Sequence, residues 1–132
     1  MIYFKLMKKK NPGDVNAPEK FYASTISMGS VDLRKMAEKI SYQSTLTPGD
    51  CYNVLSALEK NVIDELSEGK IVRLGELGTF RLSVSSEGKE TEGEFTSNSI
   101  KKKRILFLPS KGLKEMLRNL NFLKLPPRVV VP

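Results

Sequence analysis

Hydrophobic positions recur at every second residue at the start of the chain, a spacing that is typical of a β-strand. Residues 2–9 place Ile2, Phe4 and Leu6 on one face, and a second strand pattern covers residues 21–28. The turn-forming sequence Asn11-Pro-Gly-Asp14 lies between the two runs. We therefore expect a β-hairpin with a long connection. Because an isolated hairpin is only marginally stable in water, we expect it to pack on, or to extend, the sheet that follows.

Apolar residues then recur at spacings of three and four, which indicates two amphipathic helices. The first is expected to open at Ser30 as its N-cap and to end within residues 41–45. The second is expected to run from Thr47 as N-cap, with Pro48 in its first turn, to a terminal glycine at Gly69. Its apolar stripe is wide and comprises Cys51, Val54, Leu55, Ala57, Leu58, Val62, Ile63 and Leu66. Such a stripe is covered either by a second subunit or by the rest of the chain.

A glycine-marked bend separates this helical part from a part that is built from strands. Gly75 and Gly78 interrupt the strand patterns at residues 71–74 and 80–84. A polar, acidic loop covers residues 85–94, and a returning strand is expected over residues 100–107. Ser110 is expected to cap a third helix, and an irregular tail from residue 121 includes the valine run at 129–131. The predicted fold is α+β, with the order β-β-α-α-β-β-β-α.

Positive charge is concentrated near the two ends of the sequence. The chain has 132 residues, a length that suits one domain, and a net charge of +7. Residues 101–132 carry nine basic residues and one acidic residue, a net charge of +8, and residues 1–29 carry +3. The middle segments are acidic, at −3 for residues 30–69 and −1 for residues 70–100. This distribution favours an acidic partner such as nucleic acid; a basic protein with charges spread for solubility is the alternative.

Several functions find no support in the composition. The absence of His and the presence of one Cys exclude a disulfide within the chain and a Cys/His zinc site. The four glutamates of the loop (Glu87, Glu90, Glu92 and Glu94) lack the ligand spacing of a calcium loop. No glycine-rich phosphate loop precedes a helix, and no apolar run reaches the ~20 residues of a membrane span. We expect a non-enzymatic protein in the cytoplasm that binds no cofactor, metal ion, membrane or small-molecule substrate. Cys51 is expected to be a small buried hydrophobic residue.

The run Lys101-Lys-Lys-Arg104 is the most specific functional feature of the sequence. On a strand, Lys101 and Lys103 point one way and Lys102 and Arg104 the other. An extended basic run suits contact with nucleic-acid phosphates, although lysines also protect an edge strand from aggregation. The residues that we expect to contact phosphates are Arg81, Lys101, Lys102, Lys103, Arg104, Lys111 and Lys114.

The segment from Ser30 to about Leu120 resembles the HU/integration-host-factor family of bacterial histone-like DNA-binding proteins. Two short helices end at Glu68-Gly69, and the sequence Leu77-Gly-Thr-Phe80 is similar to the family's glycine- and phenylalanine-containing corner. The sequence Leu106-Phe-Leu-Pro-Ser-Lys-Gly-Leu-Lys114 is similar to its closing helix signature. The resemblance implies a nucleoid-associated homodimer with a helical base and two β-arms that embrace duplex DNA in the minor groove, with little sequence specificity.

The chain also departs from the family pattern. Glu76 replaces the first glycine of the corner, and the proline-containing arm tip is replaced by the acidic residues 85–99, where Phe95 is the one large apolar residue. Residues 1–29 have no counterpart in short family members, so we expect a strand extension (1–29), an HU-like domain (30–122) and a tail (123–132). Two alternatives stay open: an assembly module of HU fold that has lost DNA binding, and an RNA-binding variant.

Overall fold

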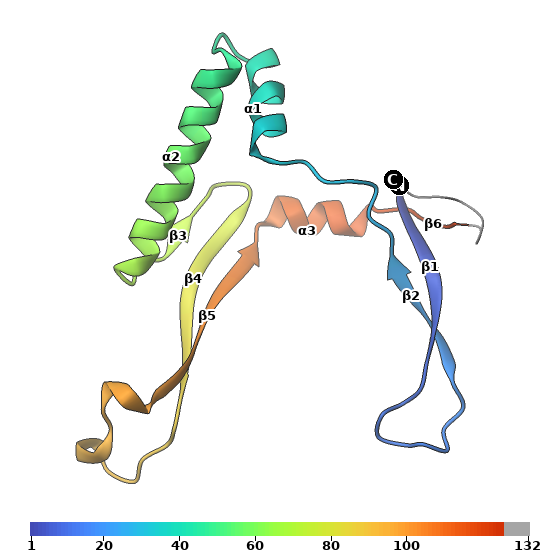
Figure 1. Cartoon of the computed structure of the whole chain (residues 1–132), viewed down its shortest axis with the longest axis vertical. Coiled ribbons are helices and arrows are strands. Elements are labelled where there is room, and N and C mark those ends of the chain that lie inside the picture. Colours follow the sequence, from blue (N-terminus) through green and yellow to red (C-terminus); the bar gives the residue numbers. More distant parts are fainter. Residues whose placement is uncertain (126–132) are drawn as a thin grey trace. The chain divides into compact units, whose positions relative to one another are not determined.

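The computed structural model describes residues 1–125, and the chain divides into two compact units. Of the described residues, one unit contains 1–32 and 117–125, and the other contains 33–116. The elements are β1 (Ile2–Lys9), β2 (Lys20–Thr25), α1 (Leu33–Tyr42), α2 (Pro48–Ser67), β3 (Val72–Arg73), β4 (Gly78–Ser86), β5 (Ile100–Pro109), α3 (Lys111–Arg118) and β6 (Phe122–Lys124) (Figure 1). The predicted α+β class is confirmed. The predicted domain boundaries, which place an HU-like domain at residues 30–122, stay a prediction.

The first unit contains a three-stranded sheet in the order β2-β1-β6. Strands β1 and β2 form the predicted antiparallel hairpin, in register from Phe4–Thr25 to Lys9–Lys20, although β2 ends at Thr25 rather than near residue 28. The hairpin does not extend the sheet that β3, β4 and β5 form, so that part of the expectation was wrong. Its third strand is β6, which pairs in parallel with β1 inside the predicted irregular tail. The rest of that tail, including the valine run at 129–131, lies outside the described residues.

Helices α1 and α2 show which local signals acted as predicted. Helix α1 begins at Leu33, so the prediction of Ser30 as its N-cap was wrong. Helix α2 begins as predicted, because the hydroxyl of Thr47 accepts a hydrogen bond from the backbone N–H of Asp50 at 3.1 Å. Gly69 closes α2 as predicted. Its φ of +79° favours glycine, and its N–H donates to the Leu66 carbonyl at 3.0 Å.

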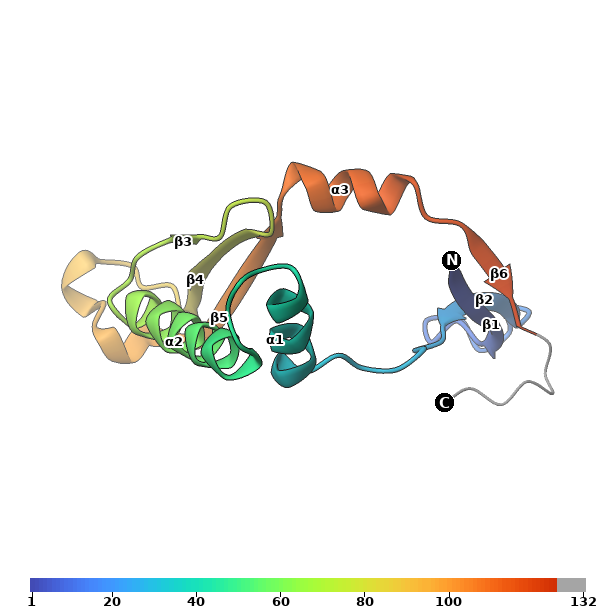
Figure 2. The same ribbon diagram turned by 90° about the horizontal axis from the view of Figure 1, so that it is seen from above.

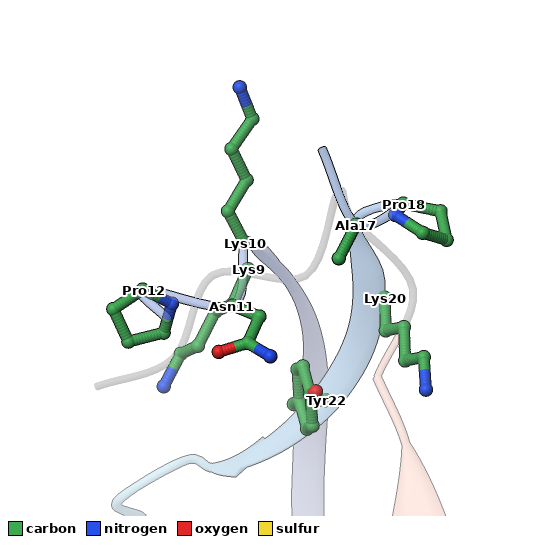
Figure 3. A pocket seen from close by; sticks show the side chains of 8 residues that line it. All are labelled: Lys9, Lys10, Asn11, Pro12, Ala17, Pro18, Lys20 and Tyr22. Atoms are coloured by element: carbon green, nitrogen blue, oxygen red, sulfur yellow. The ribbon is translucent and has the colours of Figure 1, made fainter. Parts of the chain in front are cut away.

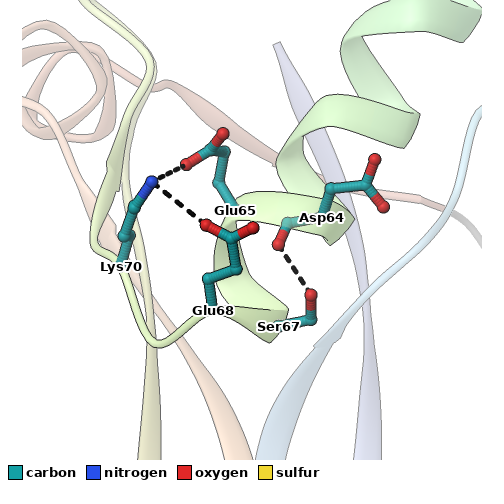
Figure 4. Close-up of polar contacts among 5 residues, drawn as sticks. All are labelled: Asp64, Glu65, Ser67, Glu68 and Lys70. Atoms are coloured by element: carbon teal, nitrogen blue, oxygen red, sulfur yellow. Dashed lines mark hydrogen bonds and ion pairs between the residues drawn. The ribbon is translucent and has the colours of Figure 1, made fainter.

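An ion-pair cluster follows the end of α2 (Figure 4). The Lys70 ammonium group lies 3.0 Å from a Glu65 carboxylate oxygen and 3.1 Å from one of Glu68. Hydrogen bonds to Glu65 and then Glu68, together with the Glu65 charge, raise the pKa of Lys70 above its ordinary value of 10.5. These contacts connect the end of the helix to the chain that enters β3.

The helices pack on each other around a small core. Ala37 of α1 and Cys51 of α2 are each only 2% exposed, and Leu66 is 8% exposed near the end of α2. The prediction that Cys51 is a buried hydrophobic residue is confirmed. Helix α2 also contacts β3 and β4, and Figure 2 shows it running along one side of that sheet.

A tight corner connects β3 to β4, as the glycines predicted. The N–H of Leu74 donates to the Gly78 carbonyl at 2.8 Å, and the N–H of Leu77 donates to the Leu74 carbonyl at 3.0 Å. Gly78 is buried at φ +152°, where a Cβ would meet the Leu108 carbonyl and lie 2.7 Å from the Phe107 ring. Only glycine fits this position, because both the backbone angle and the available space exclude a side chain.

Strands β4 and β5 form a long antiparallel ribbon that we call the arm, together with the connecting residues 87–99 (Figure 1). With β3 they make a sheet in the order β3-β4-β5. The acidic connection has more structure than its composition predicted. It contains 3₁₀ turns at Glu92–Glu94 and Ser97–Ser99, and the N–H of Glu87 donates to the Ser99 carbonyl at 2.8 Å.

Candidate nucleic-acid interface

The register of β4 with β5 gives the arm two different faces. On one face, Phe80 lies opposite Phe107, with ring centroids 4.9 Å apart, and Leu82 lies opposite Ile105. On the other face the opposed pairs are Arg81–Leu106, Ser83–Arg104 and Ser85–Lys102. Because side chains alternate along a strand, the first face is apolar and the second carries cations separated by small hydroxyl side chains.

We call Arg81, Lys102 and Arg104 the basic face of the arm. The Arg104 guanidinium donates to the Ser85 hydroxyl at 2.6 Å, so a neutral partner orients it and leaves its charge available. Arg81 is its diagonal neighbour across the two strands, a separation that long side chains can span. All three side chains are exposed, and within residues 1–125 none of them forms an ion pair.

The other two cations of the run are placed differently. Lys103 lies opposite Val84, at the end of the apolar face, as the predicted alternation requires. Lys101 lies where the register shifts near Ser85 and Ser86, and its ammonium group is 3.5 Å from a Glu87 carboxylate oxygen. Its charge is therefore partly compensated within the arm. The four consecutive cations do not act as one surface.

Lys111 and Lys114 lie in the first turns of α3, beyond the end of β5. Pro109, the last residue of β5, is five residue steps after Arg104, and a strand rises about 3.3 Å per residue, so the strand ends roughly 17 Å along the arm from Arg104 before the helix begins. The structure therefore joins Arg81, Lys102 and Arg104 in one face but does not bring Lys111 and Lys114 to it. Ser83 and Ser85, which sequence analysis did not single out, share the face because they lie two and four residues after Arg81.

The corner residue Glu76 contacts the start of α3. The Ser110 hydroxyl donates to the Glu76 carbonyl and accepts from the Leu113 N–H at 3.3 Å. A Cβ added at Gly112 would lie 3.5 Å from a Glu76 carboxylate oxygen, so the carboxylate lies beside the first turn of the helix. Negative charge is favourable at a helix N-terminus, which gives Glu76 a structural role at the corner.

The described part of the chain contains neither a metal-binding cluster nor a membrane-spanning helix. In residues 1–125 there is no group of three or more Cys, Asp and Glu side chains arranged to hold a metal ion. No helix in the same range is long and apolar enough to cross a membrane.

The family of the chain follows from its match over both units. The sequence model for HU-HIG, described as an HU domain fused to a wHTH, Ig or glycine-rich motif, matches residues 1–124. The chain belongs to the HU-HIG family. The match includes the hairpin of β1 and β2 as well as the helices and the arm. The resemblance to HU-like proteins, which was based on the corner and the closing helix, is confirmed.

Two solved structures have a similar fold to this HU-HIG chain. One is a bacterial protein from Bacteroides vulgatus for which DNA binding has been suggested. It has a TM-score of 0.60 and 14% identity, and the match covers 95% of this chain. The chain spans only half of that protein's length (50%). The other is Anabaena HU from a cocrystal with DNA, with TM-score 0.54 and 16% identity, covering 68% of this chain and 100% of that one. No protein of curated function matches the chain.

Proposed function

We propose that this HU-HIG chain is a non-enzymatic, histone-like DNA-binding protein that contacts the backbone of duplex DNA with its arm. The observation that carries the proposal is the basic face, where Arg81, Lys102 and Arg104 are exposed and have no carboxylate partner within residues 1–125. Cations that are spaced by serines along an extended ribbon suit phosphates along a groove. Lys101, Lys103, Lys111 and Lys114 add weaker, peripheral contacts.

Phosphate contacts carry no sequence information, so the arm binds different duplexes with similar affinity. The minor groove is its proposed site, and the tip sets the degree of bending. The tip is acidic, and its one large apolar side chain, Phe95, is 42% exposed. A protein of this kind belongs in the bacterial nucleoid, within the cytoplasm.

The proposal includes a homodimer, because one copy leaves much of the apolar surface of residues 33–116 uncovered. Hollows of about 300 Å³ and 310 Å³ lie between α2 and the sheet, and both are lined by Ile63. Ile63 is 66% exposed, Ile105 of the arm is 55% exposed and Leu82 is 44% exposed. A second copy offers the same apolar face, so a symmetric dimer covers both faces at once.

A salt series of DNA-binding measurements, combined with the mass in solution, tests this function. Duplex DNA should bind tightly at ~50 mM salt, and the affinity should fall steeply as salt rises, because phosphate contacts release counterions. A dimer that binds no duplex at ~50 mM salt would contradict the proposal and favour an assembly module. A clear preference for RNA in direct competition with duplex DNA would favour the RNA-binding alternative.

A further inference from the structure

A second cluster of cations lies on the hairpin of β1 and β2, outside the arm. Side chains alternate along the strands, so the register places the opposed pairs Lys5–Ser24, Met7–Tyr22 and Lys9–Lys20 on one face. We call Lys5, Lys9, Lys20 and Tyr22 the hairpin face. The opposite face carries the pairs Leu6–Ala23 and Lys8–Phe21, so the hairpin has a predominantly apolar side and a basic, aromatic side.

Lys9 and Lys20 are directly opposed across the two strands, an arrangement of like charges that costs stability. Figure 3 shows their side chains diverging on either side of Tyr22. Both line a hollow of about 450 Å³, together with Tyr22 and the turn residues Asn11 and Pro12. An anion that is bound near both ammonium groups would remove the repulsion.

The cations of the hairpin fall into two groups with different partners. Lys8 and Lys10 lie 3.4 Å and 3.8 Å from Glu19 carboxylate oxygens, so Glu19 compensates part of their charge. Within residues 1–125, Lys5, Lys9 and Lys20 form no ion pair, and all three are exposed. The charge that remains available therefore lies on the hairpin face.

We infer that the hairpin face is a second nucleic-acid contact surface, which binds the phosphates of the sugar–phosphate backbone through Lys5, Lys9 and Lys20. Tyr22 is 49% exposed between these cations and supplies an aromatic surface and a hydroxyl donor, both of which serve nucleic-acid contacts. A two-stranded ribbon can also follow a groove of the duplex. The inference extends the proposed DNA binding to residues 1–32, a part of the chain that the arm does not include.

The test is binding of a labelled duplex by the full chain in a salt series, followed by fluorescence anisotropy. The double variant Lys9→Gln/Lys20→Gln should raise Kd about tenfold at ~50 mM salt and reduce the slope of log K against log salt by about 1.8. The matched control is Lys8→Gln, compared with the single variant Lys20→Gln, because it removes one charge from the opposite face of the same hairpin, at a cation that Glu19 already compensates. It should change Kd much less.

Thermal unfolding confirms that each variant is folded, and we expect Lys9→Gln/Lys20→Gln to be at least as stable as the natural chain, since it removes a repulsion. The single variant Lys20→Gln serves if the double variant does not fold. An unchanged Kd in the hairpin variant, or an equal rise in the control, would overturn the inference. The inference would also be overturned if the hairpin variant bound anionic lipid vesicles more weakly than the natural chain but bound duplex DNA equally well.

An arm variant, Lys102→Gln/Arg104→Gln, is measured beside the hairpin variant to separate the two proposals. Weakened binding in the arm variant alone supports the proposed function and rejects the hairpin face. Weakened binding in the hairpin variant alone rejects the arm as the DNA site and supports the hairpin face. If both surfaces contact DNA, the combined variant should lose more affinity than either double variant.

Discussion

The Ser110 hydroxyl donates a hydrogen bond to the Glu76 carbonyl, which ties the corner between β3 and β4 to the first turn of α3. The same hydroxyl accepts from the Leu113 N–H, so one side chain caps the helix and anchors the corner. The backbone N–H of Ser110 adds a third bond, to the Leu77 carbonyl at 3.0 Å. The start of the arm and the start of α3 are therefore held as one structural element.

Replacing this hydroxyl should destabilise the protein. We expect Ser110→Ala to lower the free energy of unfolding by about 1 kcal/mol, the usual cost of losing an N-cap, measured by urea denaturation. Ser67→Ala is the matched control, because its exposed hydroxyl donates to the Asp64 carbonyl of the same helix at 2.6 Å. Equal losses in the two variants would contradict a special role for Ser110.

Gly78 should not tolerate a side chain. Gly78→Ala introduces a Cβ at φ +152° against the Leu108 carbonyl and the Phe107 ring, so we expect a loss of about 3 kcal/mol in the free energy of unfolding. Gly88→Ala makes the same chemical change in the arm connection, where the added Cβ would meet no atom of residues 1–125 within 4 Å beyond its chain neighbours. Its stability should stay close to that of the natural chain. A Gly78→Ala protein as stable as Gly88→Ala would contradict the described corner.

Neutralising the basic face should weaken DNA binding without changing the fold. We expect Lys102→Gln/Arg104→Gln to raise Kd at least tenfold at ~50 mM salt, and to do so equally for unrelated duplex sequences, since phosphate contacts are lost. Lys39→Gln/Lys60→Gln removes the same charge from α1 and α2 and should have a smaller effect. A loss that is confined to one DNA sequence would instead indicate base recognition by the arm.

The proposed dimer can be tested at Ile63, an exposed side chain that association of two copies would bury. A glutamate in place of Ile63 would put a charge into the apolar hollows beside α2, so Ile63→Glu should shift the mass in solution from dimer to monomer. Val15→Glu is the control, because Val15 is 85% exposed in the hairpin connection and should leave the mass unchanged. A dimer that survives Ile63→Glu would place the interface on another surface.

The Lys70 cluster should stabilise the protein in a pH-dependent way. The folded-state pKa is raised above 10.5, so the contribution is fully present below that value and is lost as pH rises through the folded pKa. Lys70→Gln should therefore lower the midpoint of thermal unfolding slightly at neutral pH, because both Glu65 and Glu68 lose their partner. The difference between variant and natural chain should shrink above pH 10.5. A difference that grows there would contradict the assignment.

Local patterns in the sequence determined most of the elements. Thr47, Pro48 and Gly69 carry their own capping and turn chemistry, so they correctly marked both ends of α2. The alternation from Ile2 to Lys9 and the glycines at 75 and 78 were similarly sufficient for β1 and the corner, because these depend on nearest neighbours along the chain. The sequence at residues 106–114 showed the family resemblance because it too is a local pattern.

Only the tertiary structure decided which distant residues meet. Strand β6 has three residues and pairs with β1 about 120 positions away, so no local pattern could predict it. The register of β4 with β5 divided the run of cations, grouping Lys102 and Arg104 with Arg81 and leaving Lys101 beside Glu87. The opposition of Lys9 and Lys20 likewise depends on the hairpin register. The sequence determines the residue types, but cross-strand pairing decides whether their charges add, repel or cancel.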